Sequence, residues 1–222
     1  MNIQILHLIE GAKQAKGVTV VIDVFRAFSV EAYLMEGGAE TIYPVGSIDF
    51  AYQYKKDHPE ILLVGERHGV MCEGFDLGNS PTQAVETDVR GKTILHTTSA
   101  GTQGIANATN ADVVLTGSLV NAKAIARYIK ALNPTDVSLV CMGLEAVEPS
   151  EEDTMCAEYI KDFDSTEEIA GDLLGYVFDD GEMFAYGELL SRVTQADAER
   201  LLREVFDPTN VCMAVIVPLT NK

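Results

Sequence analysis

The sequence predicts an α/β protein in which a mostly parallel sheet is covered by helices on both faces, a three-layer α/β/α fold. Short apolar runs rich in β-branched residues recur along the chain, and segments with helical spacing of apolar residues separate them. The runs are apolar throughout, which is typical of strands buried on both faces of a parallel sheet. With 222 residues, of which 47% are hydrophobic, the chain is long enough to bury such a core.

Seven runs are predicted to be strands, and six segments are predicted to be helices. The predicted strands are Val18–Val24, Thr41–Val45, Ile61–Gly65, Thr93–Thr97, Asp112–Thr116, Val137–Cys141 and Cys212–Pro218. The predicted helices are Arg26–Met35, Ile48–Lys56, Asn121–Leu132, Glu151–Lys161, Glu167–Phe178 and Ala196–Phe206. We expect one domain over residues 1–222, and the alternative is a smaller C-terminal lobe that begins at a change of composition near residues 143–150.

Cysteine usage and hydropathy indicate the compartment. The four cysteines are widely spaced and form no CxxC pair, which argues against a zinc ribbon and against a disulfide framework. No apolar run is long enough to span a membrane, and the N-terminus lacks a basic leader. We therefore expect a cytoplasmic protein that keeps its thiols reduced.

The net charge limits the partners that the protein can bind. Sixteen basic residues against 34 acidic ones give a formal charge of −18 at pH 7. Such a surface repels nucleic acid and anionic membranes, although most of these acids need no role beyond solubility. An anionic substrate would need local cations, either arginines or a divalent metal. A homo-oligomer is the expected state for an acidic α/β enzyme of this size.

Asp23 lies at the end of a very apolar predicted strand, Val18–Val24. Open α/β sheets bind ligands at the carboxyl ends of their strands, and a carboxylate beside apolar residues is costly unless it is paired or bound to metal. Arg26 and Ser29 follow at spacings that place them on one helix face. The functional interpretation is an anion or metal site, and the structural alternative is an Asp–Arg pair that closes the strand–helix turn.

A stretch of hydroxyl residues follows the predicted strand Thr93–Thr97. Its polar members, together with a glycine that lets the backbone approach a ligand, are Thr97, Thr98, Ser99, Gly101 and Thr102. Free N–H groups at a helix start bind anions, and the hydroxyls add further donors. The structural alternative is simple capping of the helix by Ser99. The stretch is not a Walker loop, because GxxxxGK[ST] is absent.

The acidic segment Pro149–Cys156 has two interpretations. Glu152, Asp153 and nearby hydroxyls offer the oxygen ligands that Mg²⁺ prefers, and Cys156 lies one helical turn after Glu152. Ser150 followed by Asp153 also resembles a capping box, and acids in a first turn suit the helix dipole.

The segment Gly65–Pro81, GERHGVMCEGFDLGNSP, is predicted to be a long functional loop. Glu66 follows a predicted strand, and Asn79-Ser80-Pro81 is typical of a helix start with proline at the first position. His68 lies in an Arg-His-Gly triplet like that of histidine phosphatases. Those enzymes need threonine or arginine where this chain has Met71, so we expect no histidine nucleophile here.

Four blocks together resemble the 2-phosphosulfolactate phosphatase family. They are VVIDVFRAFSV (Val20–Val30), GERHGVMCEGFDLGNSP (Gly65–Pro81), TTSAGTQGI (Thr97–Ile105) and PSEEDTMCAEYI (Pro149–Ile160). The resemblance implies a Mg²⁺-dependent acid phosphatase with a three-layer α/β/α fold. The implied reaction hydrolyses (2R)-2-phospho-3-sulfolactate to 3-sulfolactate and phosphate, a step towards coenzyme M.

The matched positions supply a set of expected site residues. The expected catalytic residues are Asp23, Arg26, Glu66, Arg67 and Cys156. The expected substrate-binding residues are Asn79, Ser80, Thr97, Thr98, Ser99, Gly101 and Thr102. Some of five carboxylates are expected to hold Mg²⁺, namely Asp23, Glu66, Asp76, Glu152 and Asp153. The alternatives are a phosphatase for another phosphorylated 2-hydroxy acid and a non-catalytic binder of small anionic acids.

Overall fold

The structure is a computed structural model that describes residues 1–163 and 215–216. The chain divides into one unit of residues 1–161 and 212–222 and another of residues 162–211. The description below concerns the first unit. The helices expected at Glu167–Phe178 and Ala196–Phe206 lie outside the described residues.

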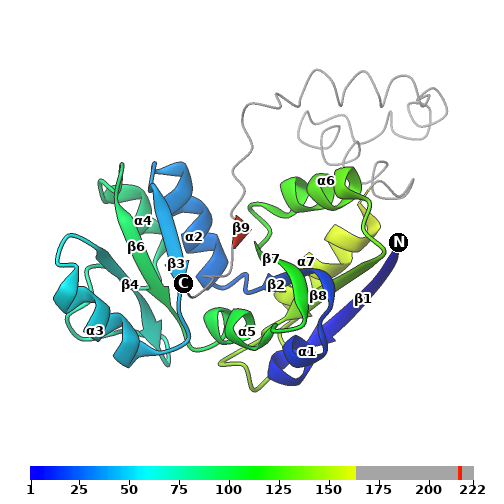
Figure 1. Cartoon of the computed structure of the whole chain (residues 1–222), viewed down its shortest axis with the longest axis horizontal. Helices are drawn as coiled ribbons and strands as arrows, with labels where there is room; N and C mark the ends of the chain where they lie inside the picture. The colour runs from blue at the N-terminus through cyan, green and yellow to red at the C-terminus, as the bar shows by residue number, and fades with distance from the viewer. Residues whose placement is uncertain (164–214, 217–222) are drawn as a thin grey trace, which may run out of the picture. The chain divides into compact units, whose positions relative to one another are not determined.

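A five-stranded sheet forms one half of this unit (Figure 1). In spatial order its strands are β1 (Asn2–His7), β8 (Asp136–Cys141), β2 (Gly17–Ile22), β7 (Ala111–Gly117) and β9 (Val215–Ile216). The first four are parallel to one another, and β9 pairs antiparallel with β7. The most central strand, β2, is buried from Val18 onwards, as its apolar sequence predicts.

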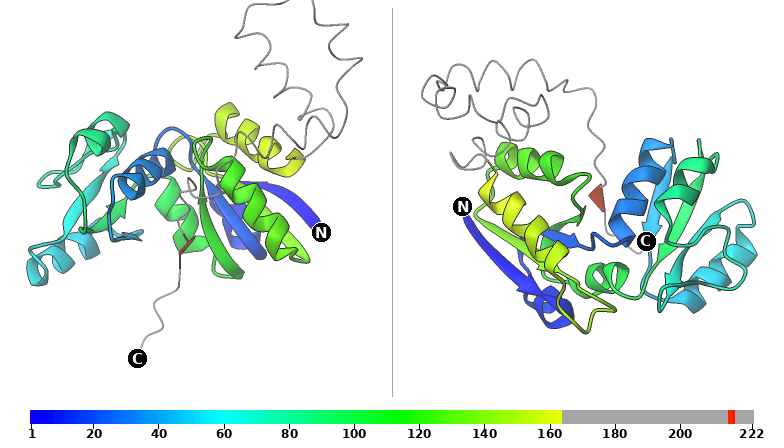
Figure 2. Two further views of the ribbon diagram at one scale, coloured as in Figure 1. Left: turned by 90° about the horizontal axis from the view of Figure 1, so that it is seen from above. Right: turned by 180° about the vertical axis from the view of Figure 1, so that it is seen from behind.

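Helices cover both faces of this sheet (Figure 1, Figure 2). Helices α1 (Leu8–Gln14) and α5 (Gly101–Asn107) lie on one face, and α6 (Ala122–Leu132) and α7 (Glu151–Asp162) lie on the other. The core beneath α1 and α5 includes Val21 and Val140 of the sheet, Met142 directly after β8, and Ala12 of α1. Within the described part of the chain, no helix is both long and apolar enough to cross a membrane.

A smaller sheet forms the other half. Its spatial order is β3 (Thr41–Pro44), β6 (Thr93–Thr97), β4 (Leu62–Arg67) and β5 (Val70–Met71), and only β5 is antiparallel to its neighbour. Helices α2 (Ala27–Glu36) and α4 (Pro81–Glu86) pack on one face, and α3 (Ile48–Asp57) packs on the other. Each sheet is therefore a middle layer between two layers of helices.

The predicted fold class is confirmed, but the parallel strands are divided between two sheets. Six of the predicted strands correspond to β2, β3, β4, β6, β7 and β8. The last predicted strand, Cys212–Pro218, contains β9. Apolar runs indicate which segments are buried, but they do not determine which strands pair, so the division between two sheets was not predicted.

The chain crosses between the two sheets at two places within its first half. It leaves the larger sheet between β2 and α2, and it returns between β6 and α5. The two crossings touch, because the Gly101 N–H donates a 2.8 Å hydrogen bond to Asp23 Oδ2. A Cβ on Gly101 would lie 2.8 Å from Phe28 Cζ and 2.9 Å from Asp23 Oδ2, so glycine permits this contact. The polar residues predicted at both strand ends are thereby brought together.

Candidate functional site

Asp23 occupies the first crossing, directly after β2. Its carboxyl accepts hydrogen bonds from the N–H groups of Ala27 (3.1 Å, at Oδ1) and Gly101 (2.8 Å, at Oδ2). Burial, followed by the negative charge of Asp153, raises the Asp23 pKa from 3.8 to about 7, although the two hydrogen bonds act in the opposite direction. The carboxyl can therefore exchange a proton near neutral pH, as a general acid or base must.

Asp153 supports Asp23 from the interior. It lies in the first turn of α7, and its two oxygens accept from the Val24 N–H and the Gly143 N–H, each at 2.8 Å. These bonds tie the carboxyl ends of β2 and β8 to α7. Burial raises the pKa of Asp153 as well. Because Asp153 is 2% exposed and both of its oxygens are used, it acts on Asp23 through its charge.

Glu66 is the corresponding carboxylate of the smaller sheet, near the end of β4. Its Oε1 accepts from the Ser99 N–H at 2.7 Å. Its Oε2 accepts from the Gly69 N–H at 2.7 Å and from Ser99 Oγ at 3.1 Å. Glu66 thus fixes the turn between β4 and β5 against the loop that follows β6.

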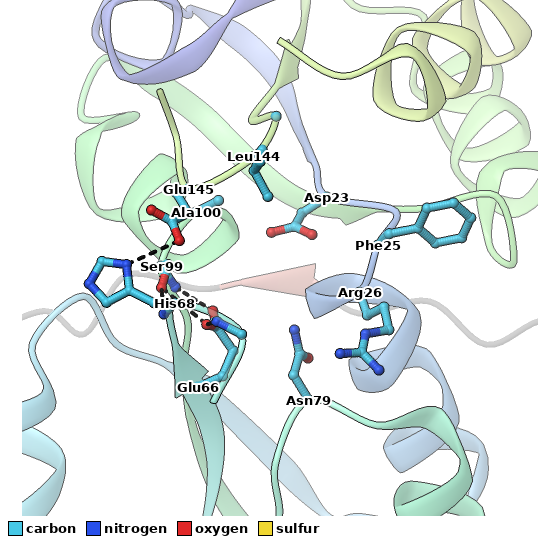
Figure 3. A pocket seen from close by; sticks show the side chains of 12 residues that line it. Asp23, Phe25, Arg26, Glu66, His68, Asn79, Ser99, Ala100, Leu144 and Glu145 are labelled. Carbon is cyan, nitrogen blue, oxygen red and sulfur yellow. Dashed lines mark hydrogen bonds and ion pairs between the residues drawn. The ribbon is translucent and has the colours of Figure 1, made fainter. Parts of the chain in front are cut away.

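Asp23 and Glu66 face a common cavity of about 180 Å³, which we call the Asp23 cavity (Figure 3). Its polar walls include Asp23, Arg26, Glu66, Asn79, Ser99 and Glu145. Arg26 is exposed, and no carboxylate pairs with it among the described residues. Figure 3 shows the Arg26 guanidinium beside the Asn79 amide, across the cavity from Leu144. The Asp23 cavity therefore combines two carboxylates with a cation that is available to an anion.

Asn79 carries a buried atom that needs a partner. Its Oδ1 is shielded from solvent and has no hydrogen-bond partner within the part of the chain that the structure describes. An amide oxygen left in this state costs free energy unless a ligand, water or cation satisfies it. Because Asn79 also lines the Asp23 cavity, its amide is a candidate group for binding a ligand there.

A second cavity of about 580 Å³ adjoins the first, and we call it the Arg67 cavity. The Arg67 guanidinium donates to the Glu66 backbone oxygen (2.7 Å), Thr97 Oγ1 (2.8 Å) and the Gly46 backbone oxygen (3.4 Å). Arg67, expected to be a catalytic residue, lines this second cavity and not the Asp23 cavity.

The hydroxyl stretch has two different roles in the structure. Thr98 and Thr102 are buried and bond to each other: the Thr98 N–H donates to Thr102 Oγ1 (2.8 Å), and the Thr102 N–H donates to Thr98 Oγ1 (3.2 Å). They hold the start of α5 together. Ser99 faces both cavities, and Thr97 holds Arg67. Of the residues that were expected to form an anion cradle, Ser99 is the one whose side chain lies on a cavity wall.

Several expected site residues lie outside both cavity walls. Asp76 accepts from the Leu63 N–H (2.8 Å) and pairs with Lys55 (3.3 Å) beside β4. Cys156 is fully buried, and burial raises its thiol pKa to about 12, so the thiolate that a nucleophile requires is scarce at neutral pH. The other expected residues that line neither cavity are Ser80, Thr97, Thr98, Gly101, Thr102, Glu152 and Asp153.

The structure also reveals wall residues that the sequence interpretation missed. Glu145 lines both cavities, and its Oε1 lies 3.0 Å from His68 Nδ1. His68 was dismissed as a nucleophile, yet it belongs to the same shared wall. The rule that ligands bind beyond the carboxyl ends of strands, applied to Val137–Cys141, would have pointed to Gly143–Glu145.

The residues of the Asp23 cavity fit a magnesium ion whose remaining ligands are water and the substrate phosphate. The described residues contain no group of three or more His, Cys, Asp or Glu side chains that could hold a metal ion. Mg²⁺, however, usually binds through one or two carboxylates, water and substrate phosphate. Asp23, Glu66 and the unsatisfied Asn79 Oδ1 are oxygen donors of this type on one cavity.

Comparison with known proteins gives the family. A family model described as 2-phosphosulpholactate phosphatase matches residues 3–205. The chain belongs to the 2-phosphosulfolactate phosphatase family. The family membership predicted from the four sequence blocks is therefore confirmed, and both cavities are formed by residues within the matched range.

Curated relatives in the 2-phosphosulfolactate phosphatase family carry the name probable 2-phosphosulfolactate phosphatase. The relative from Carboxydothermus hydrogenoformans is 42% identical over 161 residues, which cover 72% of this chain and 66% of the relative. The relative from Bacillus subtilis is 37% identical over 145 residues, or 65% of this chain and 62% of the relative. The relative from Clostridium acetobutylicum is 36% identical over 164 residues, or 72% and 69%. The chain thus spans less than two thirds of the length of the first two relatives.

Proposed function

We propose that this chain is a Mg²⁺-dependent phosphomonoester hydrolase that converts (2R)-2-phospho-3-sulfolactate and water to (2R)-3-sulfolactate and phosphate. The observation that carries the proposal is the Asp23 cavity, on which two carboxylates, an arginine and an amide lie together. Among the described residues, no carboxylate pairs with Arg26, and Asn79 Oδ1 has no hydrogen-bond partner. The names of the curated relatives support the substrate. On this proposal the enzyme serves coenzyme M biosynthesis.

Arg26 and Asn79 would bind the phosphate in this reaction. The guanidinium donates two parallel hydrogen bonds, which match two oxygens of a phosphate group. In a chain of charge −18, such a cation also offsets the repulsion that this polyanionic ester meets on approach. Binding by Arg26 and Asn79 would orient the phosphorus towards Asp23, and orientation lowers the barrier to attack.

Asp23 would act as the base for the attacking water. The water oxygen forms a bond to phosphorus, the bond from phosphorus to the ester oxygen breaks, and one water proton passes to the Asp23 carboxylate. The ester oxygen leaves with its electron pair and takes a proton from solvent. A pKa of about 7 suits Asp23 for this step, because both protonation states are populated near neutral pH.

Glu66 and Asn79 Oδ1 would hold Mg²⁺ at the same cavity, beside Asp23. When bound, the ion supplies positive charge to the phosphate oxygens and lowers the pKa of a bound water. The backbone hydrogen bonds of Glu66 keep that carboxylate in place whether or not the ion is present.

Phosphate release tests this proposal directly. Purified protein should release phosphate from 2-phospho-3-sulfolactate with Mg²⁺ and lose that activity with EDTA, and added Mg²⁺ should restore it. The matched control for cavity variants is Asp112→Asn, since Asp112 is an exposed carboxylate on β7. Full activity in excess EDTA would remove Mg²⁺ from the mechanism. Tight substrate binding without turnover would instead favour a binding protein.

A further inference from the structure

A pair of polar side chains is buried between α2 and the smaller sheet. His96 Nδ1 of β6 lies 2.7 Å from Glu31 Oε1 of α2, and the two residues are 0% and 2% exposed. Their neighbours along α2 and on the same face of β6 are apolar: Val30, Leu34 and Ile94 belong to one buried hydrophobic cluster. The proposed chemistry uses neither member of the pair, so its presence in this core needs a separate explanation.

The pair is a costly way to join α2 to β6. His96 Nε2 is shielded from solvent and has no hydrogen-bond partner within the part of the chain that the structure describes. A buried polar atom without a partner destabilises the folded state. Apolar residues of similar volume in place of a buried polar pair are often neutral or stabilising. The stability of the fold alone therefore does not account for Glu31 and His96.

The pair lies beside the two crossings between the sheets. Glu31 is on α2, the helix that follows the first crossing, and His96 is on β6, the strand that precedes the second. On the other side of the crossings, the Gly101 N–H donates to Asp23 Oδ2 at 2.8 Å. Burial and then Asp153 raise the Asp23 pKa, and His96 lowers it, so His96 is near enough to act on that carboxyl. Polar contacts thus join the two crossing segments on both sides.

Residues of the Asp23 cavity lie a few positions from each member of the pair. Arg26 is the N-cap residue of α2, five residues before Glu31, and Ser99 follows His96 by three residues. Both Arg26 and Ser99 line the cavity, and Figure 3 shows them on opposite sides of it. A shift of α2 along β6 would therefore change the distance between Arg26 and Ser99, and with it the place at which a phosphate is bound.

We propose that Glu31 and His96 are positioning residues, whose buried contact fixes α2 against β6 so that Arg26 lies opposite Ser99 across the Asp23 cavity. The inference rests on the proposed function and adds to it two residues that touch no substrate. Apolar contacts are non-directional, so they fill the same space without fixing the helix along the strand. A hydrogen bond has a preferred distance and angle, and it therefore selects one position of the helix.

An apolar replacement of the whole pair separates positioning from stability. The double variant Glu31→Leu/His96→Leu leaves no buried polar atom of the pair unsatisfied, so its urea midpoint should stay near that of wild type or rise. Its kcat/KM for 2-phospho-3-sulfolactate should nevertheless fall about 10- to 100-fold, the loss that accompanies misplaced groups around a reaction centre. Phosphate release and urea unfolding measure the two quantities on the same preparation.

Ile94→Val is the matched control for looser packing. Ile94 is buried on the same face of β6, two residues before His96, and the change removes one methylene without touching the polar pair. The urea midpoint should fall in this variant, while kcat/KM should remain close to that of wild type. Stability and activity are therefore expected to change separately in the two variants, which a purely structural role of the pair does not predict.

Two single substitutions of Glu31 distinguish the length of the side chain from its charge. Glu31→Gln keeps the reach and an acceptor oxygen, so it should retain most of the activity. Glu31→Asp keeps the charge but is one methylene shorter, so α2 must move or the contact must break, and kcat/KM should fall about tenfold. Equal kcat/KM for these two variants would overturn the inference, and this result holds even if the double variant does not fold.

Amide hydrogen exchange tests the positioning without turnover. The Gly101 N–H and the Ser99 N–H are bonded to Asp23 and Glu66, and both should exchange about tenfold faster in the double variant than in Ile94→Val. If wild type hydrolyses no ester but the exchange rates differ in this way, the proposed function is wrong and the positioning contact stands. If wild type hydrolyses the ester and the double variant has wild-type kcat/KM, the inference is wrong.

Discussion

Asp23 and Glu66 occupy equivalent places in the two sheets, yet their surroundings differ. Each is a buried carboxylate at the carboxyl end of a parallel strand, and each lines the Asp23 cavity. Glu66 accepts three hydrogen bonds, one of which comes from the Ser99 hydroxyl. Asp23 accepts two, and a second buried acid, Asp153, lies behind it. The hydrogen bonds of Glu66 thus join two backbone segments, whereas burial and the charge of Asp153 raise the pKa of Asp23.

This difference separates a structural task from a chemical one. The bonds of Glu66 hold the β4–β5 turn against the loop after β6, so its charge serves the shape of the cavity. The burial of Asp23 raises its pKa to about 7, so its charge can change during a reaction. We therefore expect substitutions at Asp23 to lower activity more than stability, and substitutions at Glu66 to lower stability as well.

The largest expected effect is the loss of turnover in Asp23→Asn. An amide of the same size cannot take a proton from water, and removal of a general base typically lowers kcat about 10²- to 10⁴-fold. The measurement is phosphate release at saturating 2-phospho-3-sulfolactate, with Asp112→Asn as the matched control and circular dichroism to verify folding. A kcat within tenfold of wild type would show that Asp23 is not the base.

The second prediction concerns the pH dependence of stability. Between pH 4 and pH 7 folded Asp23 holds a proton that the unfolded chain has released, so the free energy of unfolding falls as pH rises through this window. A shift from 3.8 to about 7 corresponds to a fall of about 2–4 kcal/mol. Above pH 7 this contribution is constant.

Urea unfolding at pH 4.5 and pH 7.5 in EDTA checks this pH dependence. Between these two pH values the free energy of unfolding should fall by about 2–4 kcal/mol less in Asp23→Asn than in wild type, because the titrating group is gone. Glu66→Gln is the matched variant from the other sheet, and it retains Asp23 and hence the fall. Identical pH profiles for wild type and Asp23→Asn would contradict the raised pKa.

The third prediction is a stability loss in Glu66→Gln. The amide offers one acceptor oxygen where the carboxylate has two, and its NH₂ group would face a backbone N–H. Hydrogen bonds to charged groups contribute about 1.5–3 kcal/mol each, so we expect unfolding to become easier by about 2–3 kcal/mol. Urea unfolding at pH 8 measures it. A change below 0.5 kcal/mol would mean that the three bonds to Ser99 and Gly69 contribute little.

The positions of these two carboxylates could be predicted from the sequence, and the reason is local. An acid after an apolar run lies at the carboxyl end of a strand, and such ends form ligand sites in α/β folds. Asp23 and Glu66 were found in this way, and Arg26 and Asn79 followed from the same blocks. The apolar runs also predicted β4, β6 and β8 to within two residues of their observed ends.

The rest of the site depends on tertiary contacts that no local pattern encodes. Thr98 and Thr102 were expected to bind an anion, but they lie in the interior and satisfy each other. Arg67 was expected to be catalytic, and no sequence pattern indicated that Thr97 Oγ1 and two backbone oxygens hold it at the neighbouring cavity. Glu145 reaches the site only because the loop after β8 lies next to the β4–β5 turn.

The smallest expected effect comes from Ser99→Ala, which tests the hydroxyl that supports Glu66. Ser99 Oγ donates to Glu66 Oε2 at 3.1 Å and accepts from the His68 N–H at 3.0 Å. The backbone bonds of Glu66 survive the change, so we expect a destabilisation of only about 1 kcal/mol. Thr109→Ala, an exposed hydroxyl removal, should stay within about 0.5 kcal/mol of wild type in the same urea titration. If Ser99→Ala destabilised the protein as much as Glu66→Gln does, the Ser99 hydroxyl rather than the backbone N–H groups would hold the Glu66 carboxylate. Glu66 and Asp23 would then differ in their side-chain partners and not in their backbone hydrogen bonds.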